Sequence, residues 1–221
     1  MGALRIALVY TVTGAELTGA VEAAVRGALG EVELASYSDP SILEEAATAG
    51  KVTREGALRL VRMYLQAVED GADAILNCCS TVGEVAASAQ GLLDCLGAPL
   101  VRIDEAMCAE AVRRGARVGV LATAATTLEP TGNTLRCAAR GQGRPLEVVD
   151  GLVEGTAGLE REVYREALLV RARELEPAVD VLVLAQGSMA YCEEYLQERL
   201  GVPVLSSPRF GAADLARRLG R

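Results

Sequence analysis

Residues 73–81 read DAILNCCST, and residues 180–188 read DVLVLAQGS. Each stretch begins with aspartate, continues through an apolar run and ends in a hydroxyl-bearing residue. Short aliphatic runs of this kind are typical of parallel strands that are buried on both faces. The two stretches therefore predict strands over residues 73–78 and 180–185.

Six further runs have the same aliphatic character, namely residues 4–10 (LRIALVY), 32–35 (VELA), 99–103 (PLVRI), 117–122 (RVGVLA), 146–149 (LEVV) and 203–207 (PVLSS). Longer stretches with helical spacing lie between them. In residues 53–70, apolar side chains recur at the period of a helix before Gly71 ends the pattern. Ser41, with Glu44 three residues later, reads as a capping box at the start of a short helix. This alternation predicts an α/β fold with parallel sheets.

The two halves of the chain correspond to each other. RIALVYT (5–11) matches RVGVLAT (117–123), and LGAPLV (96–101) matches LGVPVL (200–205). Any two Rossmann-like halves share βα periodicity, but the R-x-x-x-x-x-T and L-G-x-P pairs go beyond it. We therefore expect two similar Rossmann-like lobes related by a pseudo-twofold axis. The first is expected over residues 1–112 and the second over 113–207, with the C-terminal segment 208–221 a candidate to pack back on the first.

The repeat also predicts a site. Ligands of open parallel sheets lie beyond the carboxyl ends of the strands, so two facing lobes would place these ends around one cleft. In the alignment of the halves, Cys79 corresponds to Gln186, Thr11 to Thr123, and Thr81 to Ser188. We expect a thiol on one side of the cleft and a carboxamide on the other, ringed by hydroxyl groups.

Composition excludes several classes of function. The net charge is −8 and no Lys/Arg cluster stands out, which argues against nucleic acid or an anionic membrane as a partner. No apolar run reaches the about 18 residues that a membrane span needs, and the N-terminus lacks a secretory signal. A cytoplasmic protein with free thiols is expected. The chain has no histidine and no C-x-x-C pair, so we expect no metal and no histidine-based catalysis. It has no phosphate-binding glycine loop, so we expect no organic cofactor.

The other cysteines and the threonines have plainer interpretations. Cys78 alternates with Cys79 along the strand and is expected to belong to the core. Cys95, Cys108 and Cys137 stand in no motif and are expected to behave as small hydrophobic residues. Thr11 and Thr13 suit an ordinary turn as well as a ligand site, and Thr126 and Thr127 suit the cap of the following helix.

These motifs resemble the aspartate/glutamate/hydantoin racemase superfamily over essentially the whole chain. GADAILNCCST is similar to the first-cysteine motif, with Cys79 at the cysteine position. DVLVLAQGSMA resembles the second-cysteine motif, but Gln186 stands where the second cysteine should be. RVGVLATAATT resembles the motif that opens the second lobe, whose threonines bind carboxylate, and Thr123 and Thr126 match it. RIDEAM (102–107) and VLSSPR (204–209) are similar to an uncharacterised subgroup.

The resemblance implies acid–base chemistry at one cysteine. Racemases of the family use two thiols on opposite faces of the substrate, and a carboxamide can replace neither. Cys192 is a weak substitute, because it should lie inside the following helix. At a strand end that leads into a helix, the dipole and free N–H groups favour the thiolate form of Cys79. The chain also resembles arylmalonate decarboxylase, which works on a carbanion through one cysteine that lies on the other lobe. It resembles maleate isomerase as well, in which a thiolate adds to a carbon–carbon double bond.

Catalytic roles are therefore predicted for Cys79 and Gln186. Substrate contacts are predicted for Thr11, Ser80, Thr81, Thr123, Thr126, Gly187 and Ser188, with backbone N–H groups and no Arg or Lys on the substrate carboxylate. The leading hypothesis is a cofactor-independent isomerase or lyase acting on a small carboxylic acid. A non-catalytic protein that binds or senses a small acid, and a hydrolase with Cys79 as nucleophile, remain open. We also expect a homo-oligomer, a dimer or larger.

Overall fold

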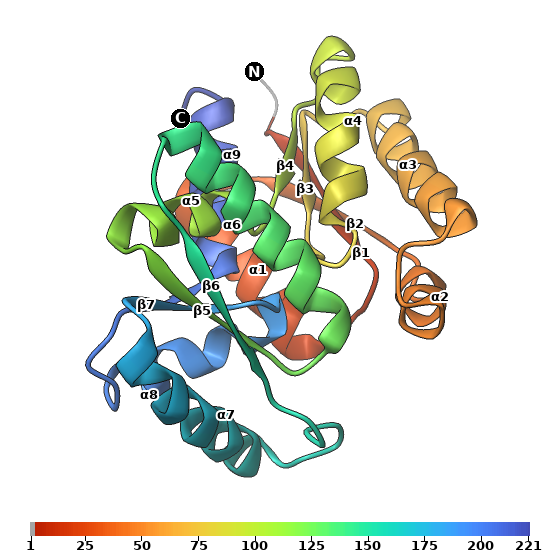
Figure 1. The fold of residues 1–221 in the computed structure, drawn as a ribbon. Coiled ribbons are helices and arrows are strands. Elements are labelled where there is room, and N and C mark those ends of the chain that lie inside the picture. Colours follow the sequence, from red (N-terminus) through yellow and green to blue (C-terminus); the bar gives the residue numbers. More distant parts are fainter. Residues whose placement is uncertain (1–2) are drawn as a thin grey trace.

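The computed structural model describes residues 3–221, and its eight strands form two parallel sheets (Figure 1). The first sheet has the order β2-β1-β3-β4 and the second the order β6-β5-β7-β8, so both halves are wound in the same way. The strands are β1 (Arg5–Tyr10), β2 (Glu33–Ser38), β3 (Ala74–Asn77), β4 (Leu100–Arg102), β5 (Arg117–Ala122), β6 (Glu147–Leu152), β7 (Val181–Leu184) and β8 (Val204–Ser206). All eight predicted strands are confirmed, as is the α/β fold class.

Alternate residues of the central strands face two separate cores. In β1, Ile6 and Leu8 belong to one hydrophobic cluster, and Ala7 and Val9 belong to another on the opposite face. The central strands of the second sheet are divided in the same way. A strand buried on both faces has no polar side to offer water, which explains its unbroken aliphatic sequence.

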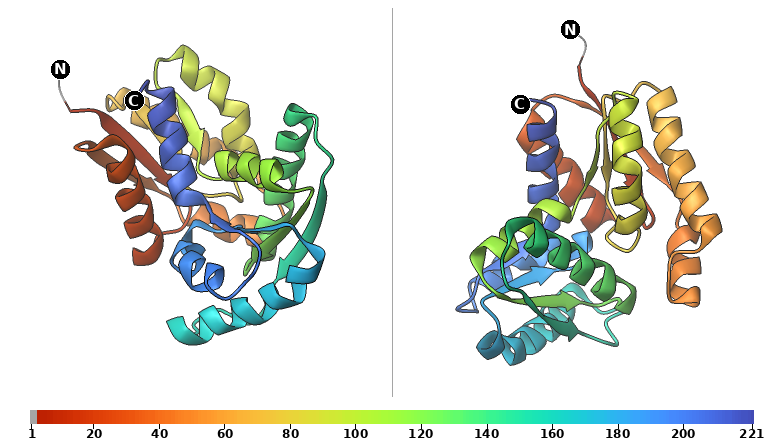
Figure 2. Two further views of the ribbon diagram at one scale, coloured as in Figure 1. Left: turned by 90° about the vertical axis from the view of Figure 1, so that its left-hand side faces the viewer. Right: turned by 45° about the horizontal axis from the view of Figure 1, so that its top comes forward.

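Helices cover both faces of each sheet (Figures 1 and 2). The α-helices are α1 (Ala15–Leu29), α2 (Ser41–Ala49), α3 (Arg54–Glu69), α4 (Gly83–Cys95), α5 (Glu105–Arg114), α6 (Leu128–Gln142), α7 (Arg161–Leu175), α8 (Glu193–Gln197) and α9 (Ser207–Arg218). Short 3-10 helices are η1 (Ala125–Thr127), η2 (Glu176–Ala178) and η3 (Gly187–Cys192). None of the helices in the described range is both long and apolar enough to cross a membrane.

The two halves exchange their last helices. Met107 and Cys108 of α5 pack into the core of the second sheet, although α5 follows β4 in the chain. Ala212 and Leu215 of α9 pack into the core of the first sheet. Figure 2 shows α9, in blue, beside α1, in red. The division into domains at residues 112 and 113 stays a prediction. In the structure Met107, Cys108, Ala111 and Val112, which precede that boundary, pack into the second core.

The capping box predicted for Ser41 and Glu44 is wrong. The helix does begin at Ser41, but Pro40 precedes it and no side chain caps it in that manner. Instead the Asp39 carboxylate accepts hydrogen bonds from the backbone N–H and the hydroxyl of Ser41. An acidic side chain two residues before the helix thus takes the part that the sequence pattern assigned to Ser41.

The exposure of two cysteines also differs from expectation. Cys108 is fully buried, as a small hydrophobic residue should be, but Cys95 and Cys137 are exposed. Both lie on helix faces that point away from the sheets, and the Cys137 sulfur accepts a hydrogen bond from Arg140. Neither residue contributes to a core.

Candidate active site

A cavity of about 200 Å³ lies where the carboxyl ends of the central strands of both sheets meet. We call it the inner cavity. Its polar wall is formed by Cys79, Gln186 and the hydroxyl-bearing residues Ser80, Thr81, Thr126, Thr127 and Ser188. Cys78 also lines the cavity, although its side chain belongs to a hydrophobic core. Its other lining residues are Gly187, Val12, Leu17, Leu43, Ala47, Ala124 and Ala185. Residues from both halves of the chain therefore enclose one space.

Most of the predicted site residues meet at this cavity. Seven of them line it, namely Cys79, Ser80, Thr81, Thr126, Gln186, Gly187 and Ser188. Thr11 and Thr123 are not among the lining residues. Neither Thr126 nor Thr127 caps α6 with its side chain, and the Thr127 hydroxyl instead donates to the carbonyl of Ala124 at 2.7 Å.

A buried hydrogen-bond chain holds the backbone of Cys79. The Asn77 side chain donates from Nδ2 to the Cys79 carbonyl at 2.9 Å. Its Oδ1 accepts from the Tyr64 hydroxyl, also at 2.9 Å, and both side chains are fully buried. The loop that carries the thiol is thus fixed to α3. Sequence reasoning missed this support, although a polar Asn77 at the end of an otherwise apolar strand was a visible signal.

Cys78 and Cys79 face different environments. Cys78 belongs to the core cluster on the α1 and α9 side of the first sheet, which confirms the prediction that it is a core residue. Its sulfur donates to the Leu76 carbonyl at 3.4 Å, and burial raises the pKa of the Cys78 thiol far above its usual value. Cys79 packs on the opposite face, between α3 and α4. The surroundings of Cys78 therefore hold its thiol in the inert, protonated form.

The Gln186 amide has a defined orientation. Its Oε1 accepts from the backbone N–H of Thr123 at 2.7 Å and from the Thr123 hydroxyl at 3.2 Å. A backbone N–H can pair only with the amide oxygen, so the Gln186 NH₂ group must face the other way. The Thr123 hydroxyl also lies 3.2 Å from the Tyr164 hydroxyl of α7. Thr123 therefore fixes the orientation of the Gln186 amide, and Tyr164 in turn contacts Thr123. The sequence alone did not predict a role for Tyr164.

Several polar groups around the cavity have no partner. The hydroxyls of Ser80 and Thr81, which line the cavity, are buried without a hydrogen bond, and so is the hydroxyl of Thr11, which does not line it. Within residues 3–221, nothing accepts from the backbone N–H groups of Ser80 or Thr81 either. The Ser80 and Thr81 groups lie just before the first turn of α4, where the helix dipole is positive. Buried polar groups are nearly always paired, so this cluster is suited to an anionic ligand.

Cys192 does not reach the inner cavity. Its side chain is fully buried in the core between α7 and the second sheet. Burial raises the pKa of its thiol to about 11. It therefore cannot replace the missing second thiol.

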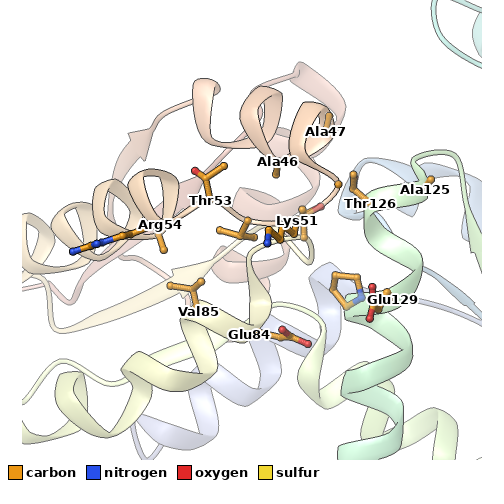
Figure 3. Close-up of a pocket in the computed structure, with 15 residues that line it drawn as sticks. Ala46, Ala47, Lys51, Thr53, Arg54, Glu84, Val85, Ala125, Thr126 and Glu129 are labelled. Carbon is orange, nitrogen blue, oxygen red and sulfur yellow. The ribbon is translucent and has the colours of Figure 1, made fainter.

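A larger pocket of about 870 Å³ adjoins the inner cavity and shares Ala47, Thr81 and Thr126 with it. We call this the outer pocket. Figure 3 shows Lys51 within it, with Glu84 and Glu129 on the far side and the Arg54 side chain extending away. Glu84 is already engaged, because its Oε1 accepts from Asn133 at 2.7 Å. In the described part of the chain, no three His, Cys, Asp or Glu side chains cluster in a way that could hold a metal ion.

A buried ion pair lies behind the start of α4. Arg102 donates to Asp104 at 3.2 and 3.0 Å and to the Thr134 hydroxyl of α6 at 2.6 Å. Its guanidinium lies directly against Gly83, the first residue of α4. The loop from Cys79 to Gly83 therefore rests on a charged group that also joins the two halves.

Comparison with known proteins agrees with this architecture. A family model described as Asp/Glu/Hydantoin racemase matches residues 6–215. Glutamate racemase isoform RacE1 from Bacillus anthracis superimposes with a TM-score of 0.72 at 18% identity, over 99% of this chain and 82% of that one. Allantoin racemase from Klebsiella pneumoniae superimposes with a TM-score of 0.68 at 19% identity, over 99% of this chain and 88% of that one. Aspartate racemase from Picrophilus torridus superimposes with a TM-score of 0.69 at 15% identity, over 99% of this chain and 95% of that one. Among curated proteins, none matches the sequence significantly.

Proposed function

The chain belongs to the Asp/Glu/hydantoin racemase family, and from that premise we propose that it is a cofactor-independent isomerase or lyase. In this proposal Cys79 transfers a proton at the carbon next to the carboxylate of a small acid. The observation that carries the proposal is the inner cavity itself. It unites Cys79 and Gln186 with hydroxyl and N–H groups that lack partners.

The unpartnered groups supply the carboxylate site. A carboxylate accepts hydrogen bonds only, and the hydroxyls of Ser80 and Thr81 with their backbone N–H groups are all able to donate. Charge-assisted hydrogen bonds of this kind are about twice as strong as neutral ones. They also stabilise the negative charge that grows on the carboxylate when the neighbouring carbon loses its proton.

Cys79 acts on one face of that carbon. The thiolate takes the proton, and the electron pair of the C–H bond moves into the carboxylate. The thiol then exchanges this proton with solvent, and the pair returns to the carbon as the same thiol gives a solvent-derived proton to the same face. Gln186 stands on the other side and cannot deliver a proton in this way, so we expect exchange of the proton without inversion.

Gln186 serves as a hydrogen-bond donor. Because Thr123 occupies its oxygen, the NH₂ group is the part left for the ligand. A fixed donor that points at developing negative charge needs no rearrangement during the reaction. Thr123 is thus proposed to position Gln186 rather than to bind the carboxylate directly.

The test is proton exchange in D₂O. Enantiopure small carboxylic acids are incubated with the protein and followed by proton NMR and by chiral chromatography. We expect deuterium to enter at the carbon next to the carboxylate with retained configuration. Cys79→Ala should abolish this exchange, and Cys78→Ala, the matched control, should retain it.

Other outcomes separate the alternatives. Exchange that survives in Cys79→Ala would overturn the proposed role of that thiol. Acid binding without any exchange would identify a protein that binds or senses an acid. Accumulation of a covalent adduct on Cys79 would instead support a hydrolase.

A further inference from the structure

Two hydrogen bonds join the first half of the chain to helix α6 of the second half. The Glu84 carboxylate, in the first turn of α4, accepts from Nδ2 of Asn133 at 2.7 Å. Nη2 of Arg102, at the end of β4, donates to the Thr134 hydroxyl at 2.6 Å. Figure 3 shows Glu84 projecting from α4 toward α6, which carries Glu129. Because the two bonds end on neighbouring residues of α6, we call Glu84, Arg102, Asn133 and Thr134 the clamp.

The clamp lies between the two walls of the inner cavity. In the first half, a Cβ added at Gly83 would lie 2.4 Å from Nη2 of Arg102, so the guanidinium packs directly against the loop that carries the thiol. The Gly83 N–H closes this loop by donating to the Ser80 carbonyl at 3.0 Å. In the second half, α6 begins directly after Thr127, and Thr126 and Thr127 line the cavity. The clamp therefore connects one wall to the other.

Most of the clamp is remote from any ligand. Arg102, Asn133 and Thr134 line neither the inner cavity nor the outer pocket. Arg102 and Asp104 are both buried, and a buried ion pair contributes little net stability, because desolvation of the two charges offsets their attraction. What the pair provides is geometry: the planar guanidinium holds Asp104 through two nitrogens and is still able to donate to Thr134.

The proposed reaction depends on the distance between the walls. Cys79 and the Ser80 and Thr81 donors belong to the first half, whereas Gln186 belongs to the second. A displacement of about 1 Å between reacting groups can cost about 10²-fold in rate. We propose that the clamp is a positioning device, which sets the spacing between the Cys79 loop and the Gln186 side of the cavity. This inference rests on the proposed function and adds positioning residues to it.

Thr134 is the position at which the clamp is best tested. Thr134→Val removes the hydroxyl and keeps the branched shape, and Thr134→Ser restores the hydroxyl. The Thr134 hydroxyl also donates to the Pro130 carbonyl of its own helix at 2.9 Å. Ser88→Ala is the matched control for that second bond, because the Ser88 hydroxyl donates to the Glu84 carbonyl within α4, also at 2.9 Å.

Proton exchange in D₂O gives the first readout. The probe is whichever of aspartate, 2-methylbutanoate and 2-phenylpropanoate exchanges fastest with the unmodified protein. Thr134→Val should lower kcat for exchange by about tenfold. The Kd of the probe should change by less than about twofold, because its carboxylate donors all lie in the first half. Thr134→Ser and Ser88→Ala should retain the original kcat. A Thr134→Val protein that is less stable to urea but exchanges with unchanged kcat would overturn the inference.

The spacing itself gives a second readout, which needs no activity. Cys95 of α4 and Cys137 of α6 are both exposed and lie in different halves, so they accept a pair of spin labels in a Cys79→Ala background. Pulsed electron paramagnetic resonance should give one narrow distance distribution for this protein. Thr134→Val combined with Asn133→Ala should broaden or shift the distribution, and Thr134→Ser should not. An unchanged distribution would overturn the inference.

The inference and the proposed function fail differently. If the unmodified protein exchanges none of the probes, the proposed function fails, and the spin-label distances still decide whether the clamp sets the spacing. If the unmodified protein exchanges a probe and the distances and kcat are insensitive to Thr134→Val, the inference alone fails.

Discussion

Replacing Gly83 by alanine should destabilise the protein, although alanine is ordinarily the better helix former. Gly83 is the first residue of α4, and a Cβ atom added there would lie 2.4 Å from Nη2 and 2.8 Å from Cζ of Arg102. Ordinary van der Waals contact begins at about 3.4 Å, so the guanidinium would have to move by about 1 Å. Arg102 is not free to do so, because Asp104 and Thr134 hold it on three hydrogen bonds.

The size of the effect follows from these contacts. Crowding a packed interior costs about 1–3 kcal/mol, and loss of a hydrogen bond to a charged group costs about 1.5–3 kcal/mol. The gain in helix propensity of up to about 1 kcal/mol offsets part of this. We expect the free energy of unfolding to fall by about 2 kcal/mol.

Gly91 provides a matched control in the same helix. An added Cβ at Gly91 meets nothing within 4 Å, so Gly91→Ala should raise the free energy of unfolding by about 0.5–1 kcal/mol. Urea denaturation with an unchanged slope measures both variants. Equal changes of the same sign at the two positions would refute the reasoning about Arg102.

Three further predictions follow from the site. In a protein with Cys95 and Cys137 replaced by serine, brief iodoacetamide treatment at pH 7 should label Cys79 and spare Cys78, because burial raises the pKa of Cys78. Peptide mass spectrometry that finds mainly Cys78 labelled would contradict this prediction. Tyr164→Phe removes the hydroxyl that contacts the Thr123 hydroxyl. Deuterium exchange into the substrate should then slow by roughly fivefold, the equivalent of one hydrogen bond of about 1 kcal/mol, with little change in ligand affinity. An unchanged rate would exclude a positioning role for Tyr164. The free energy of unfolding should fall between about pH 9 and about pH 11, because burial raises the pKa of Cys192 from 9.0 to about 11 and the unfolded chain loses that proton first. Cys192→Ala should make this fall shallower. An identical pH dependence in the variant would contradict the assignment of the fall to Cys192.

Features with a local cause were predictable from the sequence. The eight strands are continuous aliphatic runs, and burial on both faces requires such runs wherever the chain lies. The internal repeat also made the location of the site predictable from the sequence. Because both sheets have the same strand order, equivalent residues such as Cys79 and Gln186 arrive at the same cavity from the two halves.

Features that depend on distant contacts were not predictable. Thr123 matches a ligand-binding position in the sequence, but its hydroxyl is taken up by Gln186 and by Tyr164, which comes from α7. Helices α5 and α9 each pack on the sheet of the other half. The spacing of apolar residues in either helix does not show which sheet it packs against. The short helix after Asp39 was located correctly, but the Asp39 carboxylate and not the Ser41 hydroxyl accepts a backbone hydrogen bond at its start, because the Glu44 N–H bonds to the Pro40 carbonyl.

The central claim is that a single thiol works opposite a carboxamide, and restoring the second thiol tests it most directly. The unmodified protein should exchange deuterium on one face of its substrate without net racemisation. Gln186→Cys places an acid–base group on the opposite face and should gain detectable racemisation, because positioned proton transfer is worth about 10²–10⁴-fold. Efficient racemisation by the unmodified protein, persisting in Cys192→Ala, would contradict the claim.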